Sequence, residues 1–375
     1  MTIAVNTRFL LGEYLEGYGN FIFESFSRLA SKHADHQFIY IFDRPFDPRF
    51  ITSKNIKPVV AGPPARHPLL WHYWYNYKLP RILRRYKADI LVSPDGCCSL
   101  RTKVPQCIVV HDLSFIHYPE FMIKSHVSFY KRYTPFFLKK AKSIITVSES
   151  SKKDIENTYG IDGSKIDVVY NGVKNVFNPI SEVEKEIIKE KYTEGKEFFL
   201  CAGSIHPRKN LINLLKAFSI FKKRQKSNMQ LLIIGRKAWK YEGFFESLGS
   251  YKYATDVKVQ DYLPDNELAK IMAAAYALIY PSFFEGFGVP TIEAMKAEVP
   301  VLASNINSIR EICDTAAIYF DPNNYENIAD SMMKVFKDEN KRKELIQEGK
   351  KRALKFNWNN TSDLVWESIL KTMNC

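Results

Sequence analysis

Short apolar stretches alternate with longer amphipathic stretches from one end of the chain to the other. A short apolar run between turn residues is typical of a buried strand, and apolar residues at i, i+4, i+7 and i+8 are typical of one face of a helix. That helical spacing occurs at Ile22, Phe26, Leu29 and Ala30. Such alternation is typical of βαβ units, so we expect the chain to fold around parallel sheets.

The apolar runs predict strands in both halves of the chain. In the first half the predicted strands are Ile3–Asn6, Phe38–Phe42, Ile90–Val92, Ile108–His111, Ile144–Val147 and Val168–Tyr170. In the second half they are Phe198–Cys201, Leu231–Ile234, Ala277–Tyr280, Val299–Ala303 and Ala316–Phe320. Together they predict an α/β protein with two Rossmann-like, doubly wound parallel sheets.

The chain length also favours two domains, because a domain typically has about 150 residues and this chain has 375. The turn Tyr170-Asn171-Gly172 precedes a polar segment from Lys174 to Lys196, which is rich in Glu and Lys. We therefore expect a first domain over residues 1–172 and a second over residues 173–357. A last helix is predicted from Trp358 to Met373 by its apolar periodicity.

The positive charge is concentrated in the first half of the chain. The sequence has 54 Lys and Arg against 41 Asp and Glu, a net charge of +13. Residues 1–180 contain 25 basic and 15 acidic residues, a net charge of +10. With 46% hydrophobic residues, the composition excludes collagen-like, disulfide-rich miniature and largely disordered proteins. Nucleic acid, anionic lipid and a phosphorylated substrate all remain compatible with this charge.

The cysteines and the apolar runs indicate a cytoplasmic protein. The 6 cysteines form no C-x-x-C pair and no spacing of a disulfide framework or zinc site, so we expect reduced thiols. The longest nearly apolar stretch, Ile271–Pro281, is shorter than the roughly 18 residues of a membrane-spanning helix. The first residues lack the basic region of a signal peptide. The sequence thus predicts neither an export signal nor a transmembrane segment.

The segment Glu285-Gly286-Phe287-Gly288-Val289-Pro290 is the most informative, and Glu293 follows it. Pro290 is favoured at a helix start, the glycines allow close backbone approach, and a helix start supplies N–H groups for a phosphate or sugar hydroxyls. Glu285 and Glu293 can then bind different ends of one polar ligand. The alternative is a tight turn with a Glu favourably placed near a helix start.

A second anion site is predicted where a strand ends at Gly203. Asn210 is expected to cap a helix over Leu211–Phe221, which places Arg208 and Lys209 just ahead of the helix start. Two cations beside a helix N-terminus suit a diphosphate without a metal ion. The alternative is a pair of solvated surface charges.

Two features of the first half face the same sheet edge in this prediction. His111-Asp112 ends a predicted strand, where a His is either structural or functional. The segment Gly17-Tyr18-Gly19 links a strand to a helix, but Ile22 replaces the third glycine of a dinucleotide loop. It therefore indicates close backbone approach. The chain has no Asp-x-Asp and no His at metal spacing, so neither a divalent metal site nor a cofactor is predicted.

In their order along the chain these motifs resemble the retaining GT-B glycosyltransferases of family 4, the glycosyl transferases group 1 set, and their mannosyltransferase-like members. The resemblance covers residues 3 to about 330. Its motifs are Gly17–Gly19, His111-Asp112, Val147-Ser148-Glu149-Ser150, Tyr170-Asn171-Gly172-Val173, Gly203 with Arg208-Lys209-Asn210, Ile234-Gly235-Arg236, and Glu285-Gly286-Phe287-Gly288 with Pro290 and Glu293. It implies two Rossmann-like domains facing a central cleft, with the C-terminal helix, residues 358–375, returning to the first domain.

The resemblance also implies roles for individual residues. In the second domain, Arg208 and Lys209 would bind the diphosphate of a nucleotide-sugar donor, Glu285 the donor sugar and Glu293 the ribose. His111 of the first domain would contact the sugar. Further donor contacts are implied for Gly203, Gly235, Tyr262, Leu263, Gly286, Phe287, Gly288 and Val289. Acceptor contacts are implied for Gly17, Tyr18, Gly19, His111 and Asp112.

The implied reaction is metal-independent transfer of a hexosyl unit, from GDP-mannose or secondly from a UDP-hexose, to a glycan or lipid-linked glycan in cell-surface polysaccharide synthesis. In a front-face displacement the leaving phosphate helps take the acceptor proton, and Arg208 with Lys209 stabilises the departing diphosphate. One alternative is a nucleotide-sugar 2-epimerase of the same architecture. Another is a non-enzymatic nucleic-acid-binding protein, although no recognised nucleic-acid motif accompanies the basic residues.

Cations and aromatic residues are interleaved over residues 69–85 and 121–142. One hypothesis is a patch that faces an anionic membrane surface, which would place the protein peripherally at the inner face of the cell membrane, near a lipid-linked acceptor. The alternative is that the aromatic residues are core and the cations are the solvated side of helices.

Overall fold

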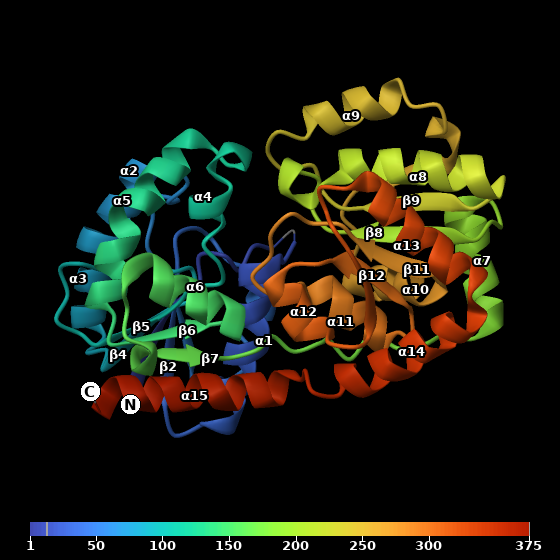
Figure 1. Ribbon diagram of the computed structural model, residues 1–375. Coiled ribbons are helices and arrows are strands. Elements are labelled where there is room, and N and C mark those ends of the chain that lie inside the picture. Colours follow the sequence, from blue (N-terminus) through green and yellow to red (C-terminus); the bar gives the residue numbers. More distant parts are fainter. Residues whose placement is uncertain (13, 375) are drawn as a thin grey trace. The chain divides into compact units, whose positions relative to one another are not determined.

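The computed structural model describes residues 1–12 and 14–374. The chain divides into two compact units (Figure 1). One contains residues 1–172 together with the C-terminal helix α15 (Trp358–Asn374), and the other is Val173–Asn357. Each unit is built on its own parallel sheet.

The described residues of the first unit form a seven-stranded sheet with the order β3-β2-β1-β4-β5-β6-β7. Its strands are β1 (Thr2–Asn6), β2 (Gln37–Phe42), β3 (Ile56–Val60), β4 (Ile90–Ser93), β5 (Gln106–Val109), β6 (Ser143–Thr146) and β7 (Ile166–Val168). All neighbours are parallel. The order reverses between β1 and β4, which makes their carboxyl ends the switch point where such sheets bind ligands.

Helices cover both faces of this sheet. They are α1 (Gly17–Lys32), α2 (Pro68–Tyr73), α3 (Leu79–Arg85), α4 (Ser114–His117), α5 (Lys124–Lys140), α6 (Glu149–Tyr159) and α15, with the π-helical turn η2 (Trp74–Lys78) and the short turns η1 (Pro48–Phe50), η3 (Pro119–Phe121) and η4 (Gly163–Lys165). Alternate residues of β1 enter opposite cores: Val5 packs with α1 and α15, whereas Ala4 packs with α2, η2 and α5. Helix α15 runs along this unit (Figure 1).

The second unit has a six-stranded sheet with the order β10-β9-β8-β11-β12-β13. Its strands are β8 (Phe198–Ala202), β9 (Gln230–Ile234), β10 (Val257–Gln260), β11 (Ala277–Tyr280), β12 (Val301–Ser304) and β13 (Ala317–Phe320). Neighbours are again parallel. Here the order reverses between β8 and β11, so the second switch point lies at their carboxyl ends.

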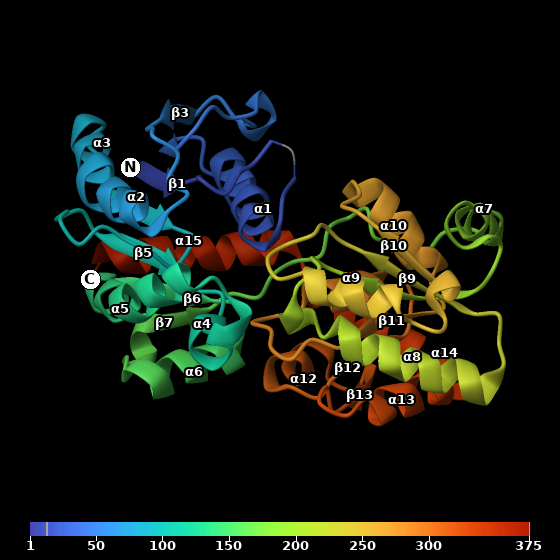
Figure 2. The same cartoon turned by 90° about the horizontal axis from the view of Figure 1, so that it is seen from above.

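The helices of the second unit connect its parallel strands, as in the first unit. They are α7 (Glu182–Thr193), α8 (Leu211–Gln225), α9 (Glu242–Gly249), α10 (Asp265–Ala274), α11 (Val289–Lys296), α12 (Asn307–Cys313), α13 (Tyr325–Lys337) and α14 (Glu339–Ala353), with the short turns η5 (Pro207–Lys209) and η6 (Ala254–Asp256). Helices α8 and α13 lie side by side in Figures 1 and 2 and share one core with β8 and β9. Helix α7 packs on α10, and α14 packs on α11.

The predicted fold class is confirmed, but two strands were missed. They are β3 and β10, which lie at the edges of their sheets. Both carry polar residues, such as Lys57 in β3 and Lys258 in β10, because one side of an edge strand is solvated. The predicted strand Val168–Tyr170 is also wrong in its bounds, since β7 is Ile166–Val168.

The described cysteines form no disulfide. Cys97, Cys98, Cys107, Cys201 and Cys313 are all buried free thiols, and Cys375 lies outside the described residues. Among the described residues, every helix is too short or too polar to cross a membrane.

A matched pair of substitutions in α15 tests its place in the first unit. Ile369 is fully buried in the core with Phe26 and Val5, whereas its neighbour Leu370 is 38% exposed. We expect Ile369→Ala to lower the free energy of unfolding by about 2–5 kcal/mol, because it leaves a cavity. Leu370→Ala should cost less than about 1 kcal/mol in the same urea titration. Equal losses would contradict the packing of α15 on this core.

Candidate functional site

The loops that follow β8 and β11 carry most of the predicted donor residues. The two strands are parallel neighbours, so their carboxyl ends meet at the switch point of the second sheet. The loop after β8 contains Gly203, Arg208 and Lys209, and the loop after β11 contains Glu285. The topology therefore brings together residues that are far apart in the sequence.

Two glycines allow the backbone to pack closely below this site. Gly203 has a φ of +140°, and a Cβ there would lie 3.2 Å from the Lys209 side chain. A Cβ on Gly235 would lie only 1.9 Å from the Gly203 carbonyl oxygen. The loops after β8 and β9 are joined here, since the Ile205 N–H donates to the Arg236 carbonyl at 2.9 Å. Both predicted glycines are thus steric requirements of the site.

Arg208, Lys209 and Glu285 form a largely buried ion cluster, with side chains 10–18% exposed. Glu285 Oε1 lies 2.7 Å from Lys209 Nζ, and Glu285 Oε2 lies 3.0 Å from Arg208 Nη1. Burial alone would raise the pKa of Glu285, but the two cations outweigh it and hold the pKa well below its ordinary value. The cluster therefore has one negative and two positive charges, a net charge of +1 at neutral pH.

The cluster includes a tyrosine that the sequence analysis missed. Lys209 Nζ donates to Tyr280 Oη at 2.9 Å, at the last residue of β11. Burial raises the pKa of Tyr280 well above its ordinary value, so the phenol stays neutral. The only signal in the sequence was its position at the end of a predicted strand.

A histidine beside the cluster was also missed. His206 is buried and stacks on Trp239, with ring centroids 5.0 Å apart. Burial, with the nearby Arg208 and Lys209, lowers the pKa of His206 to about 3, so its ring is neutral. Among the described residues its Nδ1 atom has no hydrogen-bond partner.

The predicted helix cap at Asn210 is wrong. Asn210 precedes α8 but adopts a left-handed conformation with a φ of +59°, and its side chain does not cap the helix. Its Nδ2 donates instead to the carbonyl oxygens of Pro281 and Pro322, at 3.0 and 2.7 Å. Asn210 thus ties the loop after β8 to the loop after β11. Helix α8 also extends to Gln225, beyond the predicted end at Phe221.

The glycine turn leads into α11 much as predicted, with Val289 as the first helical residue. Gly288 has a φ of +93°, and a Cβ there would lie 2.3 Å from Ile309 Cδ1. The Phe287 ring is buried and meets Phe356 edge-on at 5.7 Å. This packing fixes the backbone of Gly286, Phe287 and Gly288.

Glu293 lies within α11, partly buried and close to the ion pair of Lys174 with Asp265. Burial raises the pKa of Glu293 from about 4.5 to about 7, while Lys174 opposes the shift and Asp265 adds to it. Glu285 and Glu293 therefore differ in protonation near neutral pH. Tyr262-Leu263 follows β10, at the same carboxyl edge, and the Tyr262 side chain is 37% exposed.

In the first unit the predicted loop at Gly17–Gly19 is wrong, because α1 begins at Gly17. Gly19 is in the first helical turn, where a Cβ would lie 2.7 Å from the Phe9 carbonyl oxygen. Close packing therefore explains Gly19, whereas none of the neighbours that the structure describes lies within 4 Å of a Cβ on Gly17. Tyr18 meets the His111 ring edge-on at 4.6 Å.

The predicted strand Ile108–His111 is wrong in its bounds, because β5 ends at Val109. His111 follows the strand, and its Nε2 lies 3.2 Å from the Pro94 carbonyl oxygen. Burial lowers the pKa of His111 to about 4, so the ring is neutral at pH 7. Asp112 accepts the Ser114 N–H at 2.9 Å and so stabilises the turn into α4. This contact gives Asp112 a structural role.

The interleaved aromatic residues of the first unit are mainly core. Trp71, Trp74, Tyr75, Phe129 and Phe137 are all buried. Arg81, Arg84, Arg85, Lys131, Arg132, Lys139 and Lys140 are exposed. Among the larger apolar side chains of these stretches, Leu69, Tyr73, Ile123 and Phe136 remain exposed. Most of the pattern is thus explained by packing, and a smaller apolar surface remains among the cations.

Both units match known protein families. Residues 17–175 match the family model described as Glycosyltransferase Family 4, and residues 182–352 match the one described as Glycosyl transferases group 1. O-antigen chain mannosyltransferase B from Escherichia coli is 29% identical over 279 residues, covering 74% of this chain and 73% of that protein. O-antigen chain mannosyltransferase RfbU from Salmonella typhimurium is 29% identical over 283 residues, covering 72% of each.

A solved structure shares the fold over nearly the whole chain. Sucrose-phosphate synthase from Thermosynechococcus elongatus superposes with a TM-score of 0.81 at 16% identity, covering 99% of this chain and 98% of that one. At this identity the similarity shows the fold alone, which is GT-B. Because the two family models together span most of both units, the chain belongs to the GT-B glycosyltransferases of family 4, the glycosyl transferases group 1 set.

Proposed function

We propose that this glycosyltransferase moves a hexosyl unit, with retention of configuration, from a nucleotide-diphosphate sugar to a glycan or lipid-linked glycan in cell-surface polysaccharide synthesis. The names of the two O-antigen chain mannosyltransferases favour mannose. GDP-mannose is therefore the first donor of this proposal, and a UDP-hexose is the second.

The ion cluster of Arg208, Lys209 and Glu285 carries the proposal. Its net charge of +1 lies at a switch point, where an anionic ligand is expected. Arg208 and Lys209 would bind the donor diphosphate, with hydrogen bonds assisted by charge. Glu285 stays ionised, so it acts as an acceptor for sugar hydroxyls and not as an acid. The amides of Phe287 and Gly288 would complete the sugar site.

In the proposed reaction the bond between the sugar C1 and the diphosphate oxygen breaks, and a bond from C1 to the acceptor oxygen forms on the same face. The acceptor proton passes to the departing phosphate. Arg208 and Lys209 stabilise the charge that develops on that phosphate. His111 is neutral and would hydrogen-bond to the sugar.

Metal independence is part of the proposal, since the two cations replace a divalent ion. Transfer should therefore persist in EDTA.

The first unit would hold the acceptor in this proposal. Its sequence half carries a net charge of +10, which suits an anionic or membrane-borne acceptor. Exposed Leu69 and Tyr73 are the contacts that an anionic membrane surface would use, with Lys78 5.9 Å from the Tyr73 ring centroid and Arg81 further along the sequence.

A panel of nucleotide sugars tests the donor. The preferred donor binds only the folded protein, so at about 100 times its Kd it should stabilise the fold by about 2.7 kcal/mol. We expect GDP-mannose to raise the Tm most in a thermal-shift assay. Transfer of labelled sugar should then require an acceptor, whereas product without one would identify an epimerase. A panel that gives no shift would refute the proposal of a nucleotide-sugar donor.

Substitutions in the ion cluster separate phosphate binding from sugar binding. Lys209→Ala should lower transfer about 10²-fold to 10³-fold, because it removes a stabilising charge from the leaving diphosphate. Glu285→Gln should lower transfer as strongly yet bind free GDP at least as tightly, since the net charge of the cluster rises from +1 to +2. Steady-state rates and calorimetry with GDP measure both effects.

The control for these variants is Lys223→Ala, which removes an exposed cation from α8 and should leave transfer unchanged. Each variant is first checked by its melting curve. Near-normal turnover by folded Lys209→Ala or Glu285→Gln would overturn the assignment of the cluster.

Glu293 predicts a pH dependence. Its pKa of about 7 lies above that of the unfolded chain, so its stabilising contribution is full below about pH 4.5 and is lost as the pH rises through 7. Wild type should therefore lose up to about 3 kcal/mol relative to Glu293→Gln between about pH 5 and 8 in urea titrations. If the carboxylate accepts the ribose hydroxyls, GDP binding should also tighten over this range.

The same variant is the control for GDP binding, since comparison with Glu293→Gln removes the titration of the phosphates themselves. A pH profile of GDP affinity that is identical in both proteins would argue against a ribose contact at Glu293.

A further inference from the structure

The switch point of the first sheet holds a buried cation that the proposed reaction does not use. The order of this sheet reverses between β1 and β4, as the order of the second sheet does between β8 and β11. Arg8 follows β1, and Asp95 follows β4. These residues thus occupy the position in the first sheet that Arg208 and Glu285 occupy in the second.

Arg8 is fixed by two of its three guanidinium nitrogens. Nε lies 2.7 Å from Asp95 Oδ2, and Nη1 donates to the Ala65 carbonyl oxygen at 3.1 Å. The side chain is only 4% exposed. Within the described residues the buried Nη2 atom has no hydrogen-bond partner. A buried charged donor without an acceptor is costly, so the arrangement favours a ligand or a water molecule at Nη2.

Asp95 is already well satisfied by its neighbours. The same Oδ2 that pairs with Arg8 accepts the Asn6 side-chain amide at 2.9 Å and the Tyr75 hydroxyl at 2.5 Å. Its other oxygen, Oδ1, lies 3.2 Å from the Ser93 hydroxyl. These neutral donors share the negative charge with Arg8. The guanidinium is thus held rigidly, but Asp95 offers no acceptor to Nη2.

Aromatic rings surround the guanidinium. Its Cζ lies 4.7 Å from the ring centroid of Phe9, 5.4 Å from that of Trp71 and 5.6 Å from that of Tyr75. Phe9 is partly exposed and packs at 5.0 Å on Tyr18, which is 38% exposed. The guanidinium therefore lies against the aromatic rings of this layer. Such rings also stack on the apolar faces of sugars.

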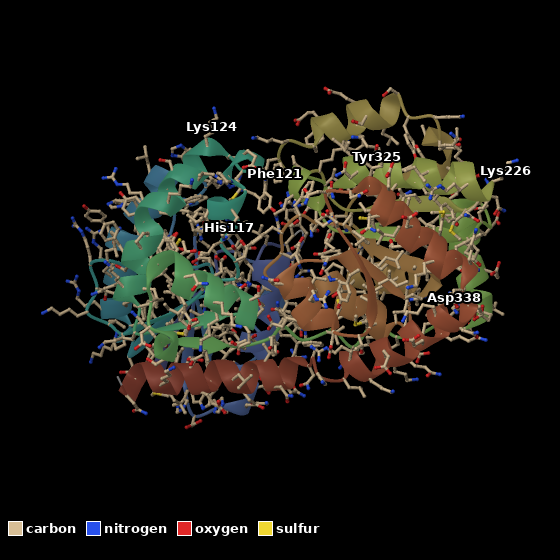
Figure 3. The ribbon with its side chains drawn as sticks, viewed as in Figure 1. His117, Phe121, Lys124, Lys226, Tyr325 and Asp338 are labelled. Carbon is tan, nitrogen blue, oxygen red and sulfur yellow. The ribbon has the colours of Figure 1, made fainter. Side chains whose placement is uncertain are left out.

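His126 extends this cluster toward the surface. Its partly exposed ring lies 4.8 Å from Trp71, near the start of α5, where Figure 3 shows Lys124 directed outward. Burial, with His67 and Arg8 nearby, lowers the pKa of His126. His126 is thus close enough to respond to the charge of Arg8. Among the described residues, Asp95 is the only negatively charged side chain that contacts Arg8.

We propose that Arg8 anchors an oxyanion subsite at the switch point of the first sheet, which binds a phosphate ester or carboxylate of the acceptor. Nη2 would donate a charge-assisted hydrogen bond to the oxyanion, and the rings of Phe9 and Trp71 would flank the attached sugar. This inference rests on the proposed function, because it assigns the acceptor to the first unit. It makes the acceptor an anionic glycan.

Calorimetry with simple anions tests the subsite. The full chain is first saturated with GDP, which fills the donor phosphate site, and is then titrated with inorganic phosphate, glucuronate or neutral glucose. Wild type should bind at least one of the two anions more tightly than glucose. Arg8→Lys should weaken that binding at least tenfold, because a single ammonium group can pair with Asp95 but leaves no second nitrogen for the ligand.

The control is Arg49→Lys, which alters an exposed Arg–Asp pair of the same unit and should leave anion binding unchanged. Binding of phosphate alone identifies a phosphorylated acceptor, and binding of glucuronate alone identifies a carboxylated one. Absence of anion binding in wild type, or equal binding by Arg8→Lys, overturns the subsite. Failure of GDP to bind would instead contradict the proposed donor, and the anion titration would still report on Arg8.

A second measurement needs no variant, in case Arg8→Lys does not fold. Wild-type crystals soaked in tungstate with GDP should show an anomalous peak within hydrogen-bond distance of Arg8 Nη2. Peaks at other positions only, at a concentration that saturates the calorimetric signal, would overturn the proposal.

Discussion

The pairing of Glu285 with Arg208 and Lys209 is the interaction on which the second unit's site depends. One largely buried carboxylate holds two cations at 3.0 and 2.7 Å and thereby joins the loops after β8 and β11. Removing Glu285 would leave two uncompensated cations in a largely buried place, which is far more costly than breaking an exposed pair, whereas removing one cation would leave a balanced ion pair. Gly203 and Gly288 have positive φ values that permit this close arrangement. The loop backbones around the site therefore adopt the conformation that the ion cluster requires.

The fold was predictable where strands are buried on both faces. Runs such as Leu231–Ile234 and Ala277–Tyr280 are apolar throughout, because helices cover both sides of a central parallel strand. The edge strands β3 and β10 carry lysines at Lys57 and Lys258 and so resemble loops in a search for apolar runs. Local pattern alone does not separate them from loops, since only the neighbouring strand makes them part of the sheet.

The site was predictable as a set of residues and not as a geometry. Arg208, Lys209 and Glu285 were selected from their types and positions, but Lys209 and Glu285 are separated by 76 residues and only the sheet order makes them partners. Asn210 was expected to cap α8, whereas carbonyl oxygens from two distant loops attract its side chain. Tyr280 was not predicted because its role depends on the hydrogen bond that its hydroxyl accepts from Lys209, which the sequence alone does not reveal. Each of these differences arises from tertiary contacts.

The two switch points use charge in different ways. In the second unit two cations share one carboxylate, so the excess positive charge is local and suits a diphosphate. In the first unit one cation faces one carboxylate, but Asn6 and Tyr75 also donate to Asp95. Within the part of the chain that the structure describes, Arg8 Nη2 therefore has no partner, and this unit needs no second cation to provide a free donor. A single guanidinium nitrogen suits one oxyanion, which is a weaker and more selective recognition than a diphosphate clamp. In our proposal, Arg8 would recognise the charged group of the acceptor through the fixed position of Nη2. The net charge of +10 in this half of the sequence would attract the acceptor at longer range.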